Sequence, residues 1–197
     1  MAFGLDPLVR GRDARSKIAL ASFSLSMLAG AGVLGLLLAI LGRPMADRVD
    51  YKGILAVVAL LVALVELQVL PARLPSRDWQ VPRDWPTKYG PIRGYALWGG
   101  TLGLGVLSYV PFASYHLFLV WLLLSRSAAV GLGMGLAYGL GRWIGSAIPA
   151  MAAARSPEQA MSKGSIALTN NQGHRTIQVG LLLVAAVWFS SVALAGA

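Results

Sequence analysis

Long apolar runs constrain the fold of this 197-residue chain more than any other feature of its sequence. Several of them approach or exceed the roughly 20 residues that an α-helix needs to cross a hydrocarbon core of about 30 Å. Only 13% of the residues are charged, whereas a typical soluble domain has about 25%. A soluble core would need shorter apolar segments with polar faces, and residues 18–42 and 176–197 have almost none. The sequence therefore predicts an all-α, polytopic integral membrane protein.

We predict a single membrane domain over residues 1–197, built as a helix bundle of about five spans. With the N-terminus in the cytoplasm, five spans leave nearly all loop lysines and arginines on the cytoplasmic side, as the positive-inside tendency requires. Six spans are possible, but they would place the basic segment after the fourth span outside. We expect a multi-pass protein of the cell (inner) membrane, with spans at about 18–42, 53–71, 94–125, 128–148 and 175–196.

The net charge of +9 follows from this topology and does not indicate a nucleic-acid partner. The basic residues lie in loops between apolar runs, and no nucleic-acid-binding motif accompanies them. The chain has no cysteine, which excludes disulfides, thiol redox chemistry, iron–sulfur clusters and cysteine-held zinc within it. His116 and His174 lie in different segments without carboxylates at ligand spacing, so we expect no metal site. Nothing in the sequence indicates a particular cofactor.

The apolar run at residues 94–124 is too long for one straight span. As a single helix it would extend about 46 Å, yet if it were cut into two spans at Pro111 the second would be too short to cross. We therefore predict one span broken or strongly bent at Pro111, near residues 108–114. Broken backbone at membrane depth is tolerated only against protein or a water-filled cavity. The neighbouring polar side chains would line a cavity there, or would merely satisfy the carbonyls of a kinked packing helix: Ser108, Tyr109, Ser114, Tyr115 and His116.

Glycines at a spacing of four predict close helix packing in the fourth span. Gly131, Gly135 and Gly139 would form a smooth ridge, which we expect Gly141 and Gly145 to extend. Helices in lipid associate through close packing of small residues, because no hydrophobic effect drives them together there. The ridge is thus predicted to receive another helix.

Two ionisable residues fall inside predicted spans, at similar depth in the five-span topology. Glu66 lies near the inner end of the second span and Arg142 near the inner end of the fourth. An intramembrane ion pair between them would relieve the cost of leaving either charge alone. The alternative is that Glu66 reaches water or a loop arginine such as Arg73.

The longest polar stretch, at residues 72–93, interleaves aromatic and basic residues. Its four prolines forbid a continuous helix. Amphipathic rings next to basic side chains suit the lipid headgroup region. A loop that docks a partner protein is the alternative interpretation.

The run GGTLGLGVLSYVPFASYHLFLVWLLL, followed by GLGMGLAYGLGRW, resembles half of the transmembrane domain of the CcdA/DsbD thiol-reductant transporters. Pro111 matches the proline of that family's broken span, and residues 137–139 match its later glycine-rich span. Phe112 stands where the redox cysteine belongs, and Tyr115 where a second proline would fall. The resemblance covers about a quarter of the chain. It implies bent helices around a midplane cavity, in a fold of six spans, but it does not imply thiol exchange without a thiol.

No residues are spaced for catalysis. The serines are scattered, no acid pair is placed for general acid–base work, and the glycine runs lie in apolar spans rather than after a strand. An enzyme could use only the few polar residues at the break. We therefore expect a non-catalytic membrane subunit, or an assembly or accessory protein, of a larger membrane complex. Its partners would be the lipid bilayer and other membrane subunits or a second copy. The alternative is a small transporter with a midplane site at residues 108–116.

Overall fold

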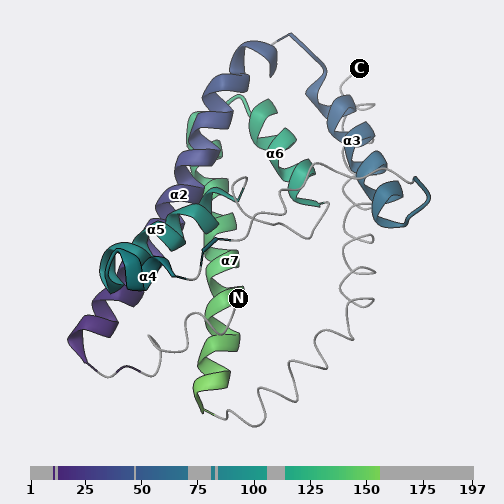
Figure 1. The fold of residues 1–197 in the computed structure, drawn as a ribbon. Helices are drawn as coiled ribbons and strands as arrows, with labels where there is room; N and C mark the ends of the chain where they lie inside the picture. The colour runs from purple at the N-terminus through teal and green to yellow at the C-terminus, as the bar shows by residue number, and fades with distance from the viewer. Residues whose placement is uncertain are drawn as a thin grey trace. The chain divides into compact units, whose positions relative to one another are not determined.

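The computed structural model describes residues 11, 13–46, 48–70, 81–82, 84–105 and 114–155, and for residues 148–155 it describes the backbone alone. Every regular element in this part of the chain is a helix, which confirms the all-α prediction there (Figure 1). In chain order the helices are α2 (Ala14–Ala46), α3 (Tyr51–Glu66), α4 (Trp85–Lys88), α5 (Pro91–Leu104), α6 (Ser114–Leu124) and α7 (Ala128–Arg155).

Two compact units each combine distant parts of the chain. Unit 1 contains α4, α5, the N-terminal part of α2 and most of α7. Unit 2 contains α3, α6, the C-terminal part of α2 from Gly35 onward and the first residues of α7. The grouping of residues 1–197 into one membrane domain stays a prediction.

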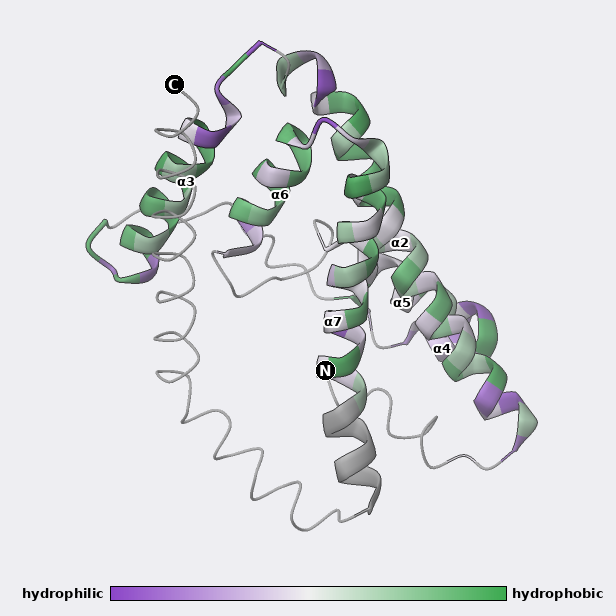
Figure 2. Cartoon of the chain, turned by 180° about the vertical axis from the view of Figure 1, so that it is seen from behind, coloured by the Kyte–Doolittle hydropathy of each residue, from purple (hydrophilic) through white to green (hydrophobic). Residues whose placement is uncertain are grey.

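Among the described helices, α2 alone is both long enough and apolar enough to cross a bilayer. Its 33 residues include the predicted span 18–42 and extend past both ends of it. Apolar side chains occupy all faces of α2, which is typical of membrane spans and of fully buried helices. Figure 2 shows hydrophobic colouring along most of its length. The structure thus gives one candidate span near the N-terminus.

The other predicted spans correspond to helices that are shorter or less apolar. α7 has 28 residues, but no 18-residue stretch of it is apolar enough to count as a candidate span by the measure that α2 passes. α3 has 16 residues and ends at Glu66, before the predicted end of the span at 53–71. Beyond it the backbone of Gln68 adopts a φ of 61°, which is incompatible with continuing a right-handed helix. The predicted span 175–196 lies outside the described residues.

The long run predicted to hold the broken span contains two separate helices. α5 ends at Leu104, and Gly105 follows with φ 66° and ψ −51°, its N–H donating to the Leu102 carbonyl. Glycine suits this backbone because it has no Cβ to clash. α6 begins at Ser114. The helical run therefore ends earlier than predicted, at a glycine before Pro111, and Pro111 itself lies outside the described residues.

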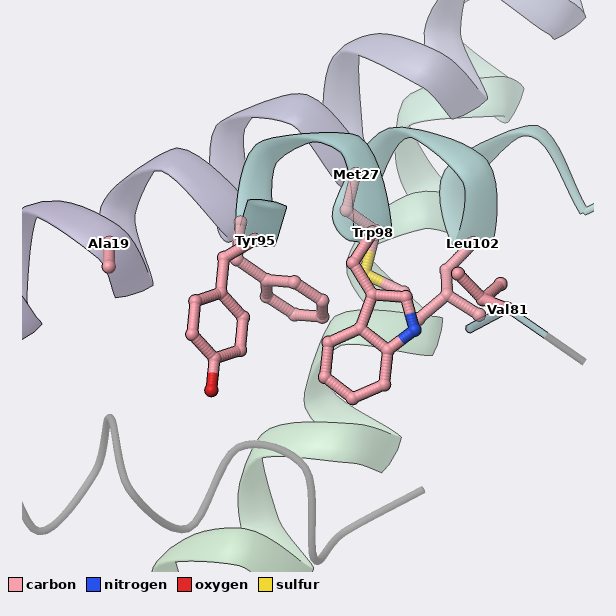
Figure 3. Close-up of a cluster of buried hydrophobic side chains, with 7 residues drawn as sticks. Ala19, Met27, Val81, Tyr95, Trp98 and Leu102 are labelled. Atoms are coloured by element: carbon pink, nitrogen blue, oxygen red, sulfur yellow. The ribbon is translucent and has the colours of Figure 1, made fainter. Parts of the chain in front are cut away.

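The core of unit 1 is an aromatic cluster between α2 and α5 (Figure 3). The Phe23 and Trp98 rings meet edge to face with centroids 6.2 Å apart, and Tyr95 and Trp98 lie 5.9 Å apart. Such aromatic pairs add stabilisation beyond the area they bury. The buried members of the cluster are Ala19, Phe23, Met27, Val81, Tyr95, Trp98 and Leu102.

The core of unit 2 forms where α3 packs on α6 beside the end of α2. Leu55 and Leu124 are almost fully buried there, together with Ala46. Arg126, in the turn after α6, donates from Nη2 to the Ala46 carbonyl over 2.9 Å. Its guanidinium carbon lies 5.0 Å from the Tyr51 ring centroid. A cation at the last carbonyls of a helix interacts favourably with the helix dipole, so Arg126 stabilises the end of α2.

Candidate functional site

The three glycines predicted to form a ridge on α7 are buried against α2. At Gly131, an added Cβ would lie 2.6 Å from the Gly35 carbonyl oxygen. At Gly135, it would overlap the Ala31 carbonyl oxygen, and at Gly139 it would lie 2.8 Å from the Ala31 Cβ. Real Cβ atoms do not approach backbone atoms so closely, so only glycine permits this separation of the two helices.

A second glycine contact joins α2 to α5 within unit 1. A Cβ at Gly99 would overlap the Phe23 carbonyl oxygen, and one at Gly103 would overlap that of Met27. A Cβ at Gly30 of α2 would lie 2.7 Å from the Gly100 carbonyl oxygen. α2 is therefore packed backbone to backbone against both of its unit 1 neighbours, as small residues allow between helices in lipid.

Trp143 of α7 makes a side-chain hydrogen bond to α2. Trp143 Nε1 donates to Ser24 Oγ over 2.7 Å, and Ser24 Oγ donates to the Leu20 carbonyl over 2.8 Å. The indole thus links α7 to α2 and satisfies a polar group that would otherwise be costly in an apolar setting.

Arg142 lies along its own helix. Its Nη1 donates to Tyr138 Oη over 2.8 Å, and its guanidinium carbon lies 5.8 Å from the Tyr138 ring centroid. Glu66 belongs to the other unit, so the Glu66–Arg142 ion pair stays a prediction.

Half of the predicted cavity residues are described, and they lie in the first turn of α6. Tyr115 is buried, and its ring meets that of His116 edge to face with centroids 6.2 Å apart. His116 Nδ1 is shielded from solvent. Ser114 is partly buried. Ser108, Tyr109 and Pro111 lie outside the described residues, so the cavity stays a prediction.

The described part of the basic-aromatic stretch forms the short helix α4, just before α5. Trp85 of α4 is partly buried against the aromatic cluster, and its ring lies 6.5 Å from that of Tyr89. Lys88 and Arg93 are exposed, and Lys88 Nζ lies 5.4 Å from the Tyr89 ring centroid. Trp85 therefore packs on the core of unit 1, while Tyr89 and the two cations are exposed.

Gly141 and Gly145 do not extend the buried ridge, contrary to the sequence prediction. A helix turns about 100° per residue, so a residue two positions after Gly139 lies on nearly the opposite face. Among the residues that the structure describes, a Cβ added at Gly133, Gly141 or Gly145 would meet nothing within 4 Å. A second row of small residues results, all of them exposed: Ala129, Gly133, Ala137, Gly141 and Gly145. Their spacing of four was visible in the sequence, but the face they occupy required the structure.

Large apolar side chains face outward on the same helices. Leu25 is 68% exposed and Leu41 71% exposed on α2, while the glycine and alanine positions between helices are buried. Leu132, Leu136 and Leu140 are exposed on α7. Leucines exposed to this extent beside buried glycines and alanines are unfavourable in water.

Neither the described side chains nor the comparisons with known proteins assign a metal site or a reaction to this chain. Across the described ranges, no three histidine, cysteine or acidic side chains gather closely enough to hold a metal ion. Comparisons with protein-family models, with curated proteins and with solved structures gave no match. The function must therefore be inferred from how this chain's own helices pack and what they expose.

Proposed function

We propose that the chain is a multi-pass protein of the inner membrane and a non-catalytic subunit, or an assembly or accessory protein, of a larger membrane complex. The proposal includes the five spans at about 18–42, 53–71, 94–125, 128–148 and 175–196, with the N-terminus in the cytoplasm. The resemblance to the CcdA/DsbD transmembrane domain supports only the proposal that the helices are packed and bent.

The proposed membrane location rests mainly on where small and large residues lie on α2. Its buried positions Ala31, Gly35 and Ala39 let a neighbour approach to backbone contact, while Leu25 and Leu41 are mostly exposed. In water the exposed leucines would be a liability. In lipid they match the acyl chains, and close packing of small residues supplies the association.

The exposed row of small residues on α7 supports the subunit part. It repeats the spacing of the buried ridge, yet no described residue lies within 4 Å of the Cβ position of Gly133, Gly141 or Gly145. Glycine in an exposed helix is unfavourable by roughly 0.5–1 kcal/mol relative to alanine. A partner helix packed on this row would explain the glycines, because it would use the same backbone approach that α2 uses on the other face.

Native gel electrophoresis of gently solubilised membranes tests this proposal. The chain should migrate with other polypeptides, and Gly141→Leu should release it from them, because a leucine would hold the partner helix away. Gly141→Leu should leave the chain itself folded, since that position is open. Gly135→Leu is the matched control, because it should disrupt the chain's own packing against Ala31. A chain that migrates alone, with or without Gly141→Leu, would contradict the subunit proposal.

A small transporter with its site at residues 108–116 is the second candidate. The interruption of the helical run between α5 and α6 favours it, because discontinuous helices often form midplane binding sites. His116→Ala should then lower uptake in vesicles that contain only this chain, because it removes a polar side chain of the proposed site. Tyr115→Phe keeps the ring and serves as the packing control. Stable purification as a monomer or homodimer would favour this candidate over the subunit.

A further inference from the structure

Exposed cations from two distant segments lie together at one end of unit 1. Phe23 of α2 meets Trp98 of α5, and one turn further along, Met27 meets Gly103. Because both contacts advance in the same direction, α5 runs parallel to α2. Lys17 precedes Phe23 by about 9 Å of helix and Arg93 precedes Trp98 by about 8 Å, at 1.5 Å per residue. The two cations therefore lie at the same level.

The remaining cations of this end come from the neighbouring turns. Arg15 lies in the first turn of α2. Lys88 ends α4, which packs on the start of α5, where Gly94 lies against the backbone of Trp85 and Pro86. Figure 1 shows α4 and α5 beside the N-terminal part of α2. The four side chains are all exposed and form what we name the basic end: Arg15, Lys17, Lys88 and Arg93.

Carboxylates at this end do not neutralise the cations. The described acids here are Asp13 and Asp84, so four positive charges face two negative ones. Asp13 caps the start of α2, because its two carboxylate oxygens accept hydrogen bonds from the Ser16 hydroxyl at 2.6 Å and the Ser16 N–H at 3.2 Å. An excess of positive charge remains directed toward solvent.

Aromatic rings also lie beside the cations of the basic end. Tyr89 is 45% exposed and its ring centroid lies 5.4 Å from Lys88 Nζ, while Trp85 and Trp143 are partly buried against the aromatic cluster. Lysines and arginines next to partly exposed tyrosine and tryptophan rings match the boundary between headgroups and acyl chains. The arrangement therefore has one side suited to anions and one suited to hydrocarbon.

We propose that the basic end binds the headgroups of anionic phospholipids and so fixes the depth of unit 1 in the cytoplasmic leaflet. This rests on the proposed membrane location. Each cation near an anionic surface contributes attraction. A phospholipid would also place acyl chains beside the partly exposed rings, which a free phosphate would not.

Quenching of tryptophan fluorescence by brominated lipid measures this preference directly. The full chain is reconstituted in phosphatidylcholine vesicles that carry either brominated phosphatidylglycerol or brominated phosphatidylcholine. We expect preferential quenching by the anionic lipid. Lys88→Gln with Arg93→Gln should lower that preference by up to roughly fivefold for each cation replaced. Arg43→Gln with Arg48→Gln, which removes two exposed cations of unit 2, is the matched control and should leave it unchanged.

Three results would overturn the inference. Equal quenching by both lipids would show no anionic preference. An equal loss in both double variants would show a general effect of net charge. Abolition of the preference by inorganic phosphate, at an ionic strength matched with sodium chloride, would indicate a site for a free anion. Alkaline carbonate extraction separates this from the proposed function: if the chain leaves the vesicles, the membrane proposal fails, and if it stays without a lipid preference, only this inference fails.

Discussion

At the scale of single residues, the glycines of α7 divide into two groups that the structure distinguishes. Gly135 lies where a methyl group would overlap the Ala31 carbonyl oxygen, whereas the Cβ position of Gly133 is open. Gly135→Ala should therefore lower the free energy of unfolding by about 1–3 kcal/mol, the usual cost of overpacking. Gly133→Ala should be neutral, or stabilising by up to about 1 kcal/mol through helix propensity. Unfolding by denaturing detergent measures both, and equal losses would contradict the assignment of the two faces.

Trp143 and Ser24 should behave as a coupled pair. Their hydrogen bond joins α7 to α2 over 2.7 Å. Trp143→Phe and Ser24→Ala should each lower stability, and the double variant should lower it by less than their sum. The coupling in this double-mutant cycle should be about 0.6 kcal/mol, the average for interhelical hydrogen bonds in membranes. Strict additivity would show that the two side chains do not interact.

The start of α2 should depend on pH through Asp13. Hydrogen bonds from the Ser16 hydroxyl and backbone N–H lower the pKa of Asp13 below its usual value of 3.8. A carboxylate with a lowered pKa stabilises the folded state above its unfolded pKa, and this contribution is lost as the pH falls through the folded pKa. The protection factor of the Ser16 amide in hydrogen exchange should therefore fall below about pH 4.

Asp13→Asn is the control for that measurement. An asparagine accepts at a helix N-terminus about as well as an aspartate but carries no proton to titrate. The variant should keep protection at Ser16 and lose its pH dependence. If acid affects both proteins equally, the pH dependence arises elsewhere.

At the scale of elements, the sequence predicted kinds of helix better than their ends. The apolar run of α2 and the four-residue spacing of Gly131, Gly135 and Gly139 depend on composition and helical period, which a sequence displays directly. The end of α5 depends on the backbone conformation of Gly105, and a run rich in glycine does not reveal which one adopts a positive φ. The prediction placed Gly141 and Gly145 on the wrong face. The spacing of four that links Gly131, Gly135 and Gly139 does not continue to Gly141, which is only two residues after Gly139.

The end of α5 gives a prediction about its last glycine. Gly105 has φ 66° and ψ −51°, a conformation in which any Cβ is strained. Gly105→Ala should lower the free energy of unfolding by about 1–3 kcal/mol. Gly100→Ala is the matched control on the same helix, because its Cβ would make only an ordinary contact 3.8 Å from the Ser26 carbonyl oxygen. Equal stability of the two variants in denaturing detergent would mean that α5 ends differently.

At the scale of the whole molecule, the membrane orientation stays a prediction from charge, and the packing of unit 1 gathers some of those charges. The positive-inside tendency places the N-terminus in the cytoplasm from loop composition alone. The basic end of unit 1 collects Lys17 and Arg93 at one level through the contacts of α2 with α5. The predicted count of five spans rests on the same charge bias, because only α2 among the described helices is long and apolar enough by itself to cross a bilayer.

The span number can be measured by labelling single cysteines, because the chain contains none. With five spans and a cytoplasmic N-terminus, cysteines replacing Ser76 and Ser162 should be protected from a membrane-impermeant reagent in intact cells, and one replacing Ala197 should react. All three should react after permeabilisation, which controls for burial within the protein. Reaction at Ser162 from outside, with Ser76 still protected, would require six spans. The prediction of five spans would then be wrong, and the basic segment after α7 would face outward, contrary to the positive-inside tendency.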